Sequence, residues 1–202
     1  MNRSLKRLIV TSLALTLTAL AEKDTGFKAR PAASYASKQT VEKVTIAVSA
    51  FSTEERMREA FGKVDLNKSG VLPVLVVIRN ETGKTLLLDR LRVAYVSPKG
   101  QQIDATPASE LPYLTGPSRP KYDASGPIPG GGPRIKRKKN PMSSELMEVR
   151  GFSAKLIPNG EEGSGFFYFH TGIQSGAQIY VTGMREAGSG KEIFYAEIPL
   201  AE

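Results

Sequence analysis

Hydrophobic and polar residues alternate along several short stretches of the chain, and this two-residue period is typical of half-buried β-strands. The first stretch covers residues 44–48, and a longer apolar run rich in β-branched residues covers residues 71–78. Further strand patterns lie at residues 86–88, 91–95, 102–104, 152–157, 165–169, 178–185 and 192–200. Clusters of Gly, Pro, Asn and Ser between these stretches are typical of tight turns.

One stretch has the period of a helix instead. Thr53 precedes Glu54 and Glu55, as at a helix start where a hydroxyl caps the first turn and acidic residues follow. Apolar residues then recur at helical spacing at positions 57, 60, 61 and 64. We expect one short amphipathic helix that ends near residues 62–64, and a helical turn within residues 142–149.

Many short strands with regular turns and one small helix predict an antiparallel β-sandwich. The alternation of strands and helices that a parallel sheet requires is missing from the sequence. Burial of each large core residue stabilises such a fold by about 1.5–3 kcal/mol. The predicted core comprises Val44, Ile46, Leu75, Val77, Leu88, Val93, Tyr95, Phe167, Phe169, Tyr180 and Phe194.

Residues 1–21 have the layout of a secretory signal peptide. Three basic residues, the last of them Arg7, precede an apolar run of 14 residues that closes on Ala19-Leu20-Ala21. A membrane span needs about 20 apolar residues, so the run favours a cleaved leader over an uncleaved anchor. We therefore expect an exported protein, periplasmic or secreted, that is soluble after cleavage.

Two further segments lack the strand pattern. Residues 22–39 are rich in Ala, Lys and Ser without periodicity, which predicts a flexible tether before a β-sandwich domain at residues 40–202. Residues 115–141 hold five Gly and six Pro. That composition buries too little apolar surface to offset the entropy of ordering, so it predicts a disordered insertion within the domain.

The order of the motifs resembles that of a known group of proteins. Residues 72–105 read as an apolar strand, Asn-Glu-Thr-Gly, a leucine-rich strand, a Tyr-Val strand and Pro-Lys-Gly. Residues 152–169 read as Phe, Leu-Ile-Pro-Asn-Gly-Glu and Gly-Phe-Phe-Tyr-Phe. Together they resemble the exported bacterial immunoglobulin-like β-sandwich proteins of unassigned function. The resemblance implies a mainly β, immunoglobulin-like antiparallel sandwich with one short helix, no assigned catalysis and, as a departure, a long Gly/Pro-rich insertion.

Composition narrows the possible chemistry. The chain has no Cys, which excludes disulfides, thiolate metal sites, cysteine nucleophiles and lipid attachment at a cysteine. Removal of the leader takes three of the 28 Lys and Arg, leaving 25 against 20 Asp and Glu, a net charge of +5. This mild excess favours solubility more than a nucleic-acid surface. There is no Trp, and His170 is the only His.

Two motifs imitate ligand sites. Residues 65–72 carry oxygen donors and a Gly at EF-hand spacing, but the twelfth position, which should supply a bidentate Glu, is Val76. A helix-to-strand turn explains the same residues. The pairs Gly83-Lys84 and Gly190-Lys191 lack the earlier Gly of a phosphate-binding loop, so they indicate hairpin turns. We predict no metal site and no cofactor.

The candidate binding residues form a basic run inside the insertion: Arg134, Lys136, Arg137, Lys138 and Lys139. One interpretation is electrostatic docking on another envelope protein or on an anionic surface of lipid headgroups or polysaccharide. The other is a solvated charge run in a loop. No aromatic residue is interleaved with these charges, so sequence-specific nucleic-acid binding is not expected.

Two hypotheses of function remain open. The first is an exported, non-catalytic binding or accessory module, which agrees with the leader, the sandwich pattern and the lack of a recognisable catalytic set. The alternative is a hydrolase whose site is assembled around His170 from distant carboxylates. The sequence identifies neither the ligand nor the oligomeric state.

The leader hypothesis predicts the mature N-terminus. N-terminal sequencing of exported protein should begin at or near Glu22, because Ala19 and Ala21 supply the small residues of a cleavage site. Full-length chain in a washed membrane fraction would indicate an anchor instead.

The docking interpretation predicts binding to anionic vesicles with an affinity that falls steeply as salt rises. Neutralising residues 136–139 together should remove this binding without lowering thermal stability, because no core residue is touched. Limited trypsin digestion should also cut first within residues 115–141. Unchanged vesicle binding would contradict the docking role, and resistance to trypsin would contradict the disorder.

Overall fold

A computed structural model of the protein describes residues 26–114, 142, 145–193 and 195–201. The predicted leader, the predicted insertion at residues 115–141 with its basic run, and Phe194 lie outside the described residues. Within the described part of the chain, no helix is long and apolar enough to cross a membrane.

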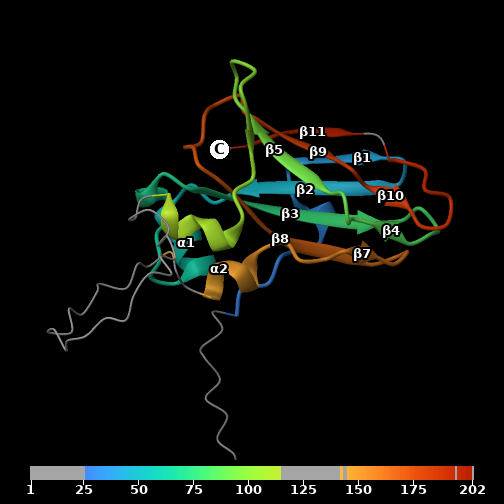
Figure 1. The fold of residues 1–202 in the computed structure, drawn as a ribbon, viewed down its shortest axis with the longest axis horizontal. Coiled ribbons are helices and arrows are strands. Elements are labelled where there is room, and N and C mark those ends of the chain that lie inside the picture. Colours follow the sequence, from blue (N-terminus) through green and yellow to red (C-terminus); the bar gives the residue numbers. More distant parts are fainter. Residues whose placement is uncertain (1–25, 115–141, 143–144, 194, 202) are drawn as a thin grey trace, which may run out of the picture.

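Short antiparallel strands are the main secondary structure of the described residues (Figure 1). The strands are β1 Lys38–Val41, β2 Val44–Ala50, β3 Leu72–Asn80, β4 Leu86–Leu87, β5 Arg92–Val96, β6 Gln102–Asp104, β7 Leu156–Ile157, β8 Glu162–Phe169, β9 Gln178–Thr182, β10 Arg185–Glu186 and β11 Ala196–Pro199. The helices are α1 Glu54–Phe61 and α2 Glu145–Arg150, and the 3₁₀ turns are η1 Ala32–Ser34, η2 Asn67–Ser69 and η3 Ala108–Tyr113.

Two four-stranded sheets form the sandwich, in the orders β1-β2-β3-β8 and β11-β9-β5-β6. Strands β2, β3 and β8 correspond to A, B and E of an immunoglobulin sandwich, and β6, β5, β9 and β11 correspond to C′, C, F and G. A small sheet, β10-β4-β7, lies at one end of the molecule (Figure 1). The predicted antiparallel β-sandwich is therefore confirmed.

Strand β3 is buried on both faces. One face packs in the core between the two sheets, with Ile46 of β2, Tyr95 of β5 and Ile179 of β9. The other face packs in a second core beneath α1, η1 and α2, where Phe61 and Tyr168 lie. Burial on both sides explains why residues 71–78 form a continuous apolar run without alternation.

Helix α1 follows β2 and precedes β3 along the chain, and it agrees with the predicted helix. The Thr53 hydroxyl accepts a hydrogen bond from the backbone N–H of Arg56, which caps the first turn. The helix ends at Gly62, whose φ of 63° would disfavour a side chain. Its apolar face enters the second core through Met57, Ala60 and Phe61.

The prediction of a flexible tether is wrong for residues 26–39. Ala32 and Tyr35 are 0% and 6% exposed, and the Phe27 ring lies 5.7 Å from the Phe51 ring. Strand β1 then pairs with β2, so that Lys38 lies opposite Ala47. The apolar residues of this segment cover the outer face of a sheet, but they are irregularly spaced along the chain. The sequence therefore shows no periodicity from which an ordered segment could be predicted.

One margin of the sandwich is closed by β1 and β11, which belong to different sheets. The backbone N–H of Glu197 donates to the Gln39 side-chain oxygen at 2.9 Å, and the Ala201 N–H donates to the Ser37 hydroxyl at 3.1 Å. These bonds join strand edges that would otherwise present unpaired backbone groups.

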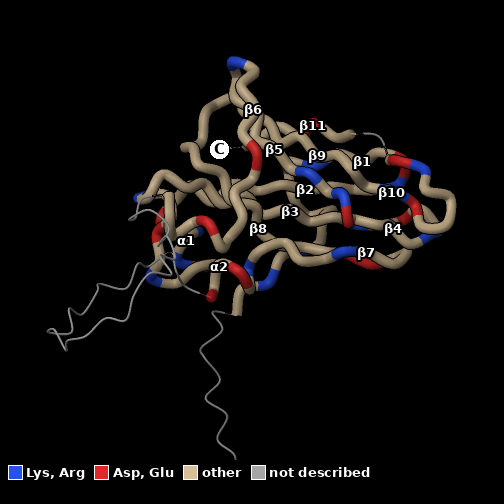
Figure 2. The backbone as a smooth tube through the Cα atoms, in the orientation of Figure 1, with Lys and Arg blue, Asp and Glu red and all other residues tan. Residues whose placement is uncertain are grey.

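Charged residues gather on the turns at the end that carries β4 and β10 (Figure 2). The Lys84 Nζ lies 2.7 Å from a Glu186 oxygen, and Arg185 lies 2.8 Å from Asp89. Lys191 pairs with Glu42. The Lys84 ammonium, as a hydrogen-bond donor, lowers the pKa of the Glu186 carboxyl. The Lys of each Gly-Lys pair thus forms an ion pair in a turn. The turn at Gly190-Lys191 is closed by the Arg185–Glu192 bridge, but the predicted hairpin at Gly83-Lys84 is wrong, because β3 and β4 belong to different sheets.

Most of the predicted core is buried, but two residues are not. Phe167 and Tyr180 are only partly buried. On β9 the residues that face the core are Ile179 and Val181, one position out of phase with Tyr180. A shift of one residue moves a side chain to the opposite face of a strand, so this error changes which face carries the aromatic ring.

The turn between β9 and β10 yields a stability prediction. Gly183 has a φ of +81°, and a Cβ there would lie 1.9 Å from the Arg90 carbonyl oxygen. Gly188 has a φ of +85°, and a Cβ there would meet nothing within 4 Å. In urea unfolding, Gly188→Ala should cost about 1–2 kcal/mol from the left-handed backbone alone. Gly183→Ala should cost clearly more, and equal losses would contradict the steric argument.

Candidate functional site

The margin opposite β1 and β11 is open because β6 leaves its sheet. Strand β6 pairs with β5 only from Ala94 to Val96. After Asp104 the chain crosses to the other sheet, where the Thr106 N–H donates to the Tyr168 carbonyl of β8 at 2.7 Å. The crossing leaves a fork between β5 and β8.

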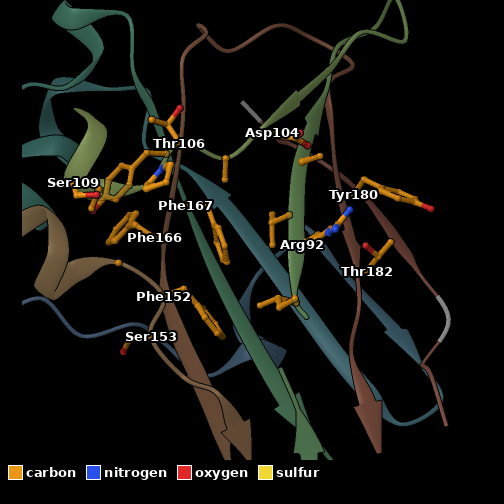
Figure 3. Close-up of a pocket in the computed structure, with 18 of the residues that line it drawn as sticks. Arg92, Asp104, Thr106, Ser109, Phe152, Ser153, Phe166, Phe167, Tyr180 and Thr182 are labelled. Atoms are coloured by element: carbon orange, nitrogen blue, oxygen red, sulfur yellow. The ribbon is translucent and has the colours of Figure 1, made fainter. Parts of the chain in front are cut away.

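A groove of about 1000 Å³ lies in this fork (Figure 3). Its residues come from β5, β6, β8, β9 and the segments around residues 105–109 and 151–153. Phe167 and Phe152 line one side, and Arg92, Tyr180 and Thr182 lie on the other (Figure 3). The volume is at the upper end of the range of small-ligand sites, about 300–1000 Å³.

An aromatic pair forms the apolar part of the groove. The Phe152 and Phe167 rings stack at 5.4 Å with an angle of 26° between their planes. The Phe152 N–H donates to the Phe166 carbonyl at 3.1 Å, which ties this segment to the edge of β8. A Cβ at Gly165 would lie 2.3 Å from Phe152 Cα, so only glycine allows this close crossing.

Several polar side chains around the groove have no partner among the described residues. Among the described residues, the side chains of Arg92, Thr106, Ser109, Glu148, Ser153 and Thr182 make no hydrogen bond or ion pair. The Asp104 carboxylate accepts a 3.4 Å hydrogen bond from the Gln102 amide. Donors and acceptors are therefore available to a ligand on several sides of the groove.

The backbone of β5 also presents unpaired groups. The Ser97 N–H donates to the Gln101 carbonyl, so Ser97, and by alternation Tyr95 and Val93, direct their backbone groups toward β6. Tyr95 lies opposite Ile103, but β6 has left before it reaches Val93. Within the described residues, the N–H and C=O of Val93 thus face the groove without a partner from β6.

The buried hydroxyl beside the groove has a structural role. Tyr168 donates a hydrogen bond to the Met147 carbonyl at 2.8 Å. Burial raises the pKa of Tyr168, so the phenol stays protonated at any physiological pH. Tyr168 therefore fixes α2 against β8 and supplies no base to the groove.

His170 lies outside this groove. It is exposed at the end of β8, and a Cβ on Gly70 would lie 3.7 Å from its imidazole. Among the described residues, no carboxylate or hydroxyl forms a hydrogen bond with His170. The structure thus brings no described partner to the residue on which the hydrolase hypothesis depends.

The calcium-like motif forms the turn that leads from α1 to β3. Both Asp65 oxygens interact with Lys68, one with its N–H at 3.4 Å and one with its ammonium at 3.1 Å. The Asn67 amide donates to the Phe51 carbonyl at 3.0 Å. In the described residues there is no group of three or more His, Asp or Glu side chains placed to hold a metal ion.

Comparisons with known proteins give no family. No family model and no curated protein matches the chain. The solved structure of target SoR45 of the Northeast Structural Genomics Consortium is 13% identical, with a TM-score of 0.34, over 79% of this chain and 87% of that one. A functionally unknown protein from Listeria monocytogenes EGD-e is also 13% identical, with a TM-score of 0.33, over 81% and 82%. Similarity this low assigns neither a fold family nor a function.

The predicted binding residues and the groove are separate. The basic run at residues 134–139 lies outside the described residues, so its docking role stays a prediction. No pattern in the sequence indicates the groove, although Phe167 and Tyr180 stand out as large residues of predicted strands. Phe167 is partly exposed where β6 has left β5, and a short strand pattern at residues 102–104 does not reveal that departure. Tyr180 is partly exposed because it lies on the outer face of β9.

Proposed function

We propose that this chain is an exported, non-catalytic binding module that holds an extended segment of a partner protein in the groove between β5 and β8. One observation carries the proposal: Val93 turns its backbone N–H and C=O to the groove at the point where β6 has left. Such an edge is a template for strand addition, in which a peptide pairs through its backbone. The leader pattern of residues 1–21 supports export.

The lining of the groove agrees with a peptide ligand. Alternate side chains of an added strand point to opposite faces. One set would contact the stacked rings of Phe152 and Phe167, and the other would lie near Arg92 and Thr182 on the outer face of the sheet. Arg92 and Asp104, which lies opposite Ala94 in the same sheet, and Glu148 of α2 offer charges of both signs, which selects among peptide sequences.

A random peptide library displayed on phage tests the proposal. Enriched peptides should bind with an affinity that Phe167→Ala weakens about tenfold or more, because an aromatic contact surface is lost. Leu156→Ala is the control, since this exposed residue of β7 lies outside the groove. Melting temperatures of both variants separate loss of binding from loss of folding.

Backbone methylation of an enriched peptide distinguishes strand addition from other binding modes. A strand pairs through one edge, so N-methylation should abolish binding at alternate residues only. Loss at every position, or at none, would contradict pairing with β5. A library that yields no peptide sensitive to Phe167→Ala would contradict the proposed function itself.

A further inference from the structure

A second cavity, of about 480 Å³, lies on the opposite face of the β1-β2-β3-β8 sheet from the main core, beside α1. The N-terminal segment around residues 27–37 forms one wall, and β2 and α1 form the other. Its polar lining includes three cations and one carboxylate: Lys28, Arg30, Arg56 and Glu59. This cavity is separate from the groove between β5 and β8, and its lining residues differ.

Arg56 is held rigidly in this cavity. One guanidinium nitrogen donates to the Ala50 carbonyl and another to the Ser49 hydroxyl, both at 2.6 Å. The face of the guanidinium lies over the Phe51 ring, 4.3 Å from its centroid. Both hydrogen-bond acceptors are neutral, so neither compensates the positive charge. Partial burial lowers the pKa of Arg56, which nevertheless stays ionised at neutral pH.

Arg30 adds a second guanidinium. It lies over the Tyr35 ring, 4.9 Å from the centroid, and it is close enough to disfavour the charged form of Arg56. Among the described residues, Lys28, Arg30 and Arg56 make no ion pair. Glu59 is exposed and favours the charge of Arg56 from a distance, but one carboxylate does not balance three cations.

Partly buried charges in proteins are ordinarily paired, because removal from water without a counter-charge is costly. We propose that this cavity binds an anionic ligand, whose phosphate or carboxylate group lies between the guanidinium groups of Arg56 and Arg30. The planar guanidinium fork matches both oxyanions. Two hydrogen bonds and the stacking on Phe51 fix the Arg56 fork in advance, which lowers the entropic cost of binding.

The size and lining of the cavity also indicate which chemical group carries the oxyanion. It is much larger than one oxyanion, since a water molecule takes about 30 Å³ in the liquid. Phe27, Tyr35, Phe51 and Leu75 line its apolar part. The expected ligand is therefore an oxyanion attached to an aromatic or aliphatic group.

Four probes test the site: inorganic phosphate, phenyl phosphate, acetate and benzoate, each compared with chloride at equal ionic strength. Melting temperature and isothermal titration calorimetry provide the readouts. We expect the two aromatic probes to raise the melting temperature more than phosphate and acetate do. The stronger of phenyl phosphate and benzoate identifies the oxyanion class.

Matched variants locate the binding. Arg30→Gln and Lys28→Gln should each keep the fold, because both side chains are exposed, and Arg30→Gln should weaken binding about tenfold. Arg58→Gln is the control, since this exposed arginine lies on the same helix as Arg56 and pairs with Glu54 instead. Equal effects of Arg30→Gln and Arg58→Gln would overturn the proposal, as would probes that act no differently from chloride.

A carboxylate of the chain itself is the competing explanation. Glu202 follows Ala201, which lines the cavity. The Glu202→Gln variant should bind benzoate and phenyl phosphate as the unmodified chain does. If these probes bind only to the Glu202→Gln variant, the chain supplies its own anion and the proposed external ligand is refuted.

Discussion

Burial of β3 on both faces is the constraint on which the rest of the structure depends. A strand with two apolar faces requires a cover on each side, and here a second sheet covers one face while helices and the N-terminal segment cover the other. The second cover explains why residues 27–35 cannot remain a tether. It also creates the cationic cavity, because Arg30 and Arg56 come from the two elements that meet over this face.

The strands and α1 could be predicted from the sequence because their signals are local. The cap at Thr53 and the alternation at residues 44–48 each depend on neighbouring residues only. The two-layer cover of β3 depends on contacts between distant residues, such as Phe27 with Phe166, whose rings lie 5.5 Å apart. Neither residue lies in a pattern that indicates the other.

The two cavities could not be predicted from the sequence for a related reason. Locating a groove at a fork requires knowledge of where a strand stops pairing, and the short pattern at residues 102–104 does not show where the chain leaves β5. Likewise, the cations of the second cavity lie in two segments that are distant in the sequence, at residues 28–30 and at residue 56. The basic run at residues 134–139 was conspicuous because its charges are consecutive.

The two margins of the sandwich differ in the hydrogen bonds that join the two sheets. Side-chain hydrogen bonds join β1 to β11 on one margin, whereas the Thr106–Tyr168 backbone bond crosses between the sheets on the other. We therefore expect relative motion of the two sheets to be largest at the open margin. A ligand that contacts both β5 and β8 would restrict this motion, and its affinity would include an unfavourable entropy from the freedom that the two sheets lose. Substitutions that stiffen the margin in advance would remove part of that cost, although they touch no atom of the ligand.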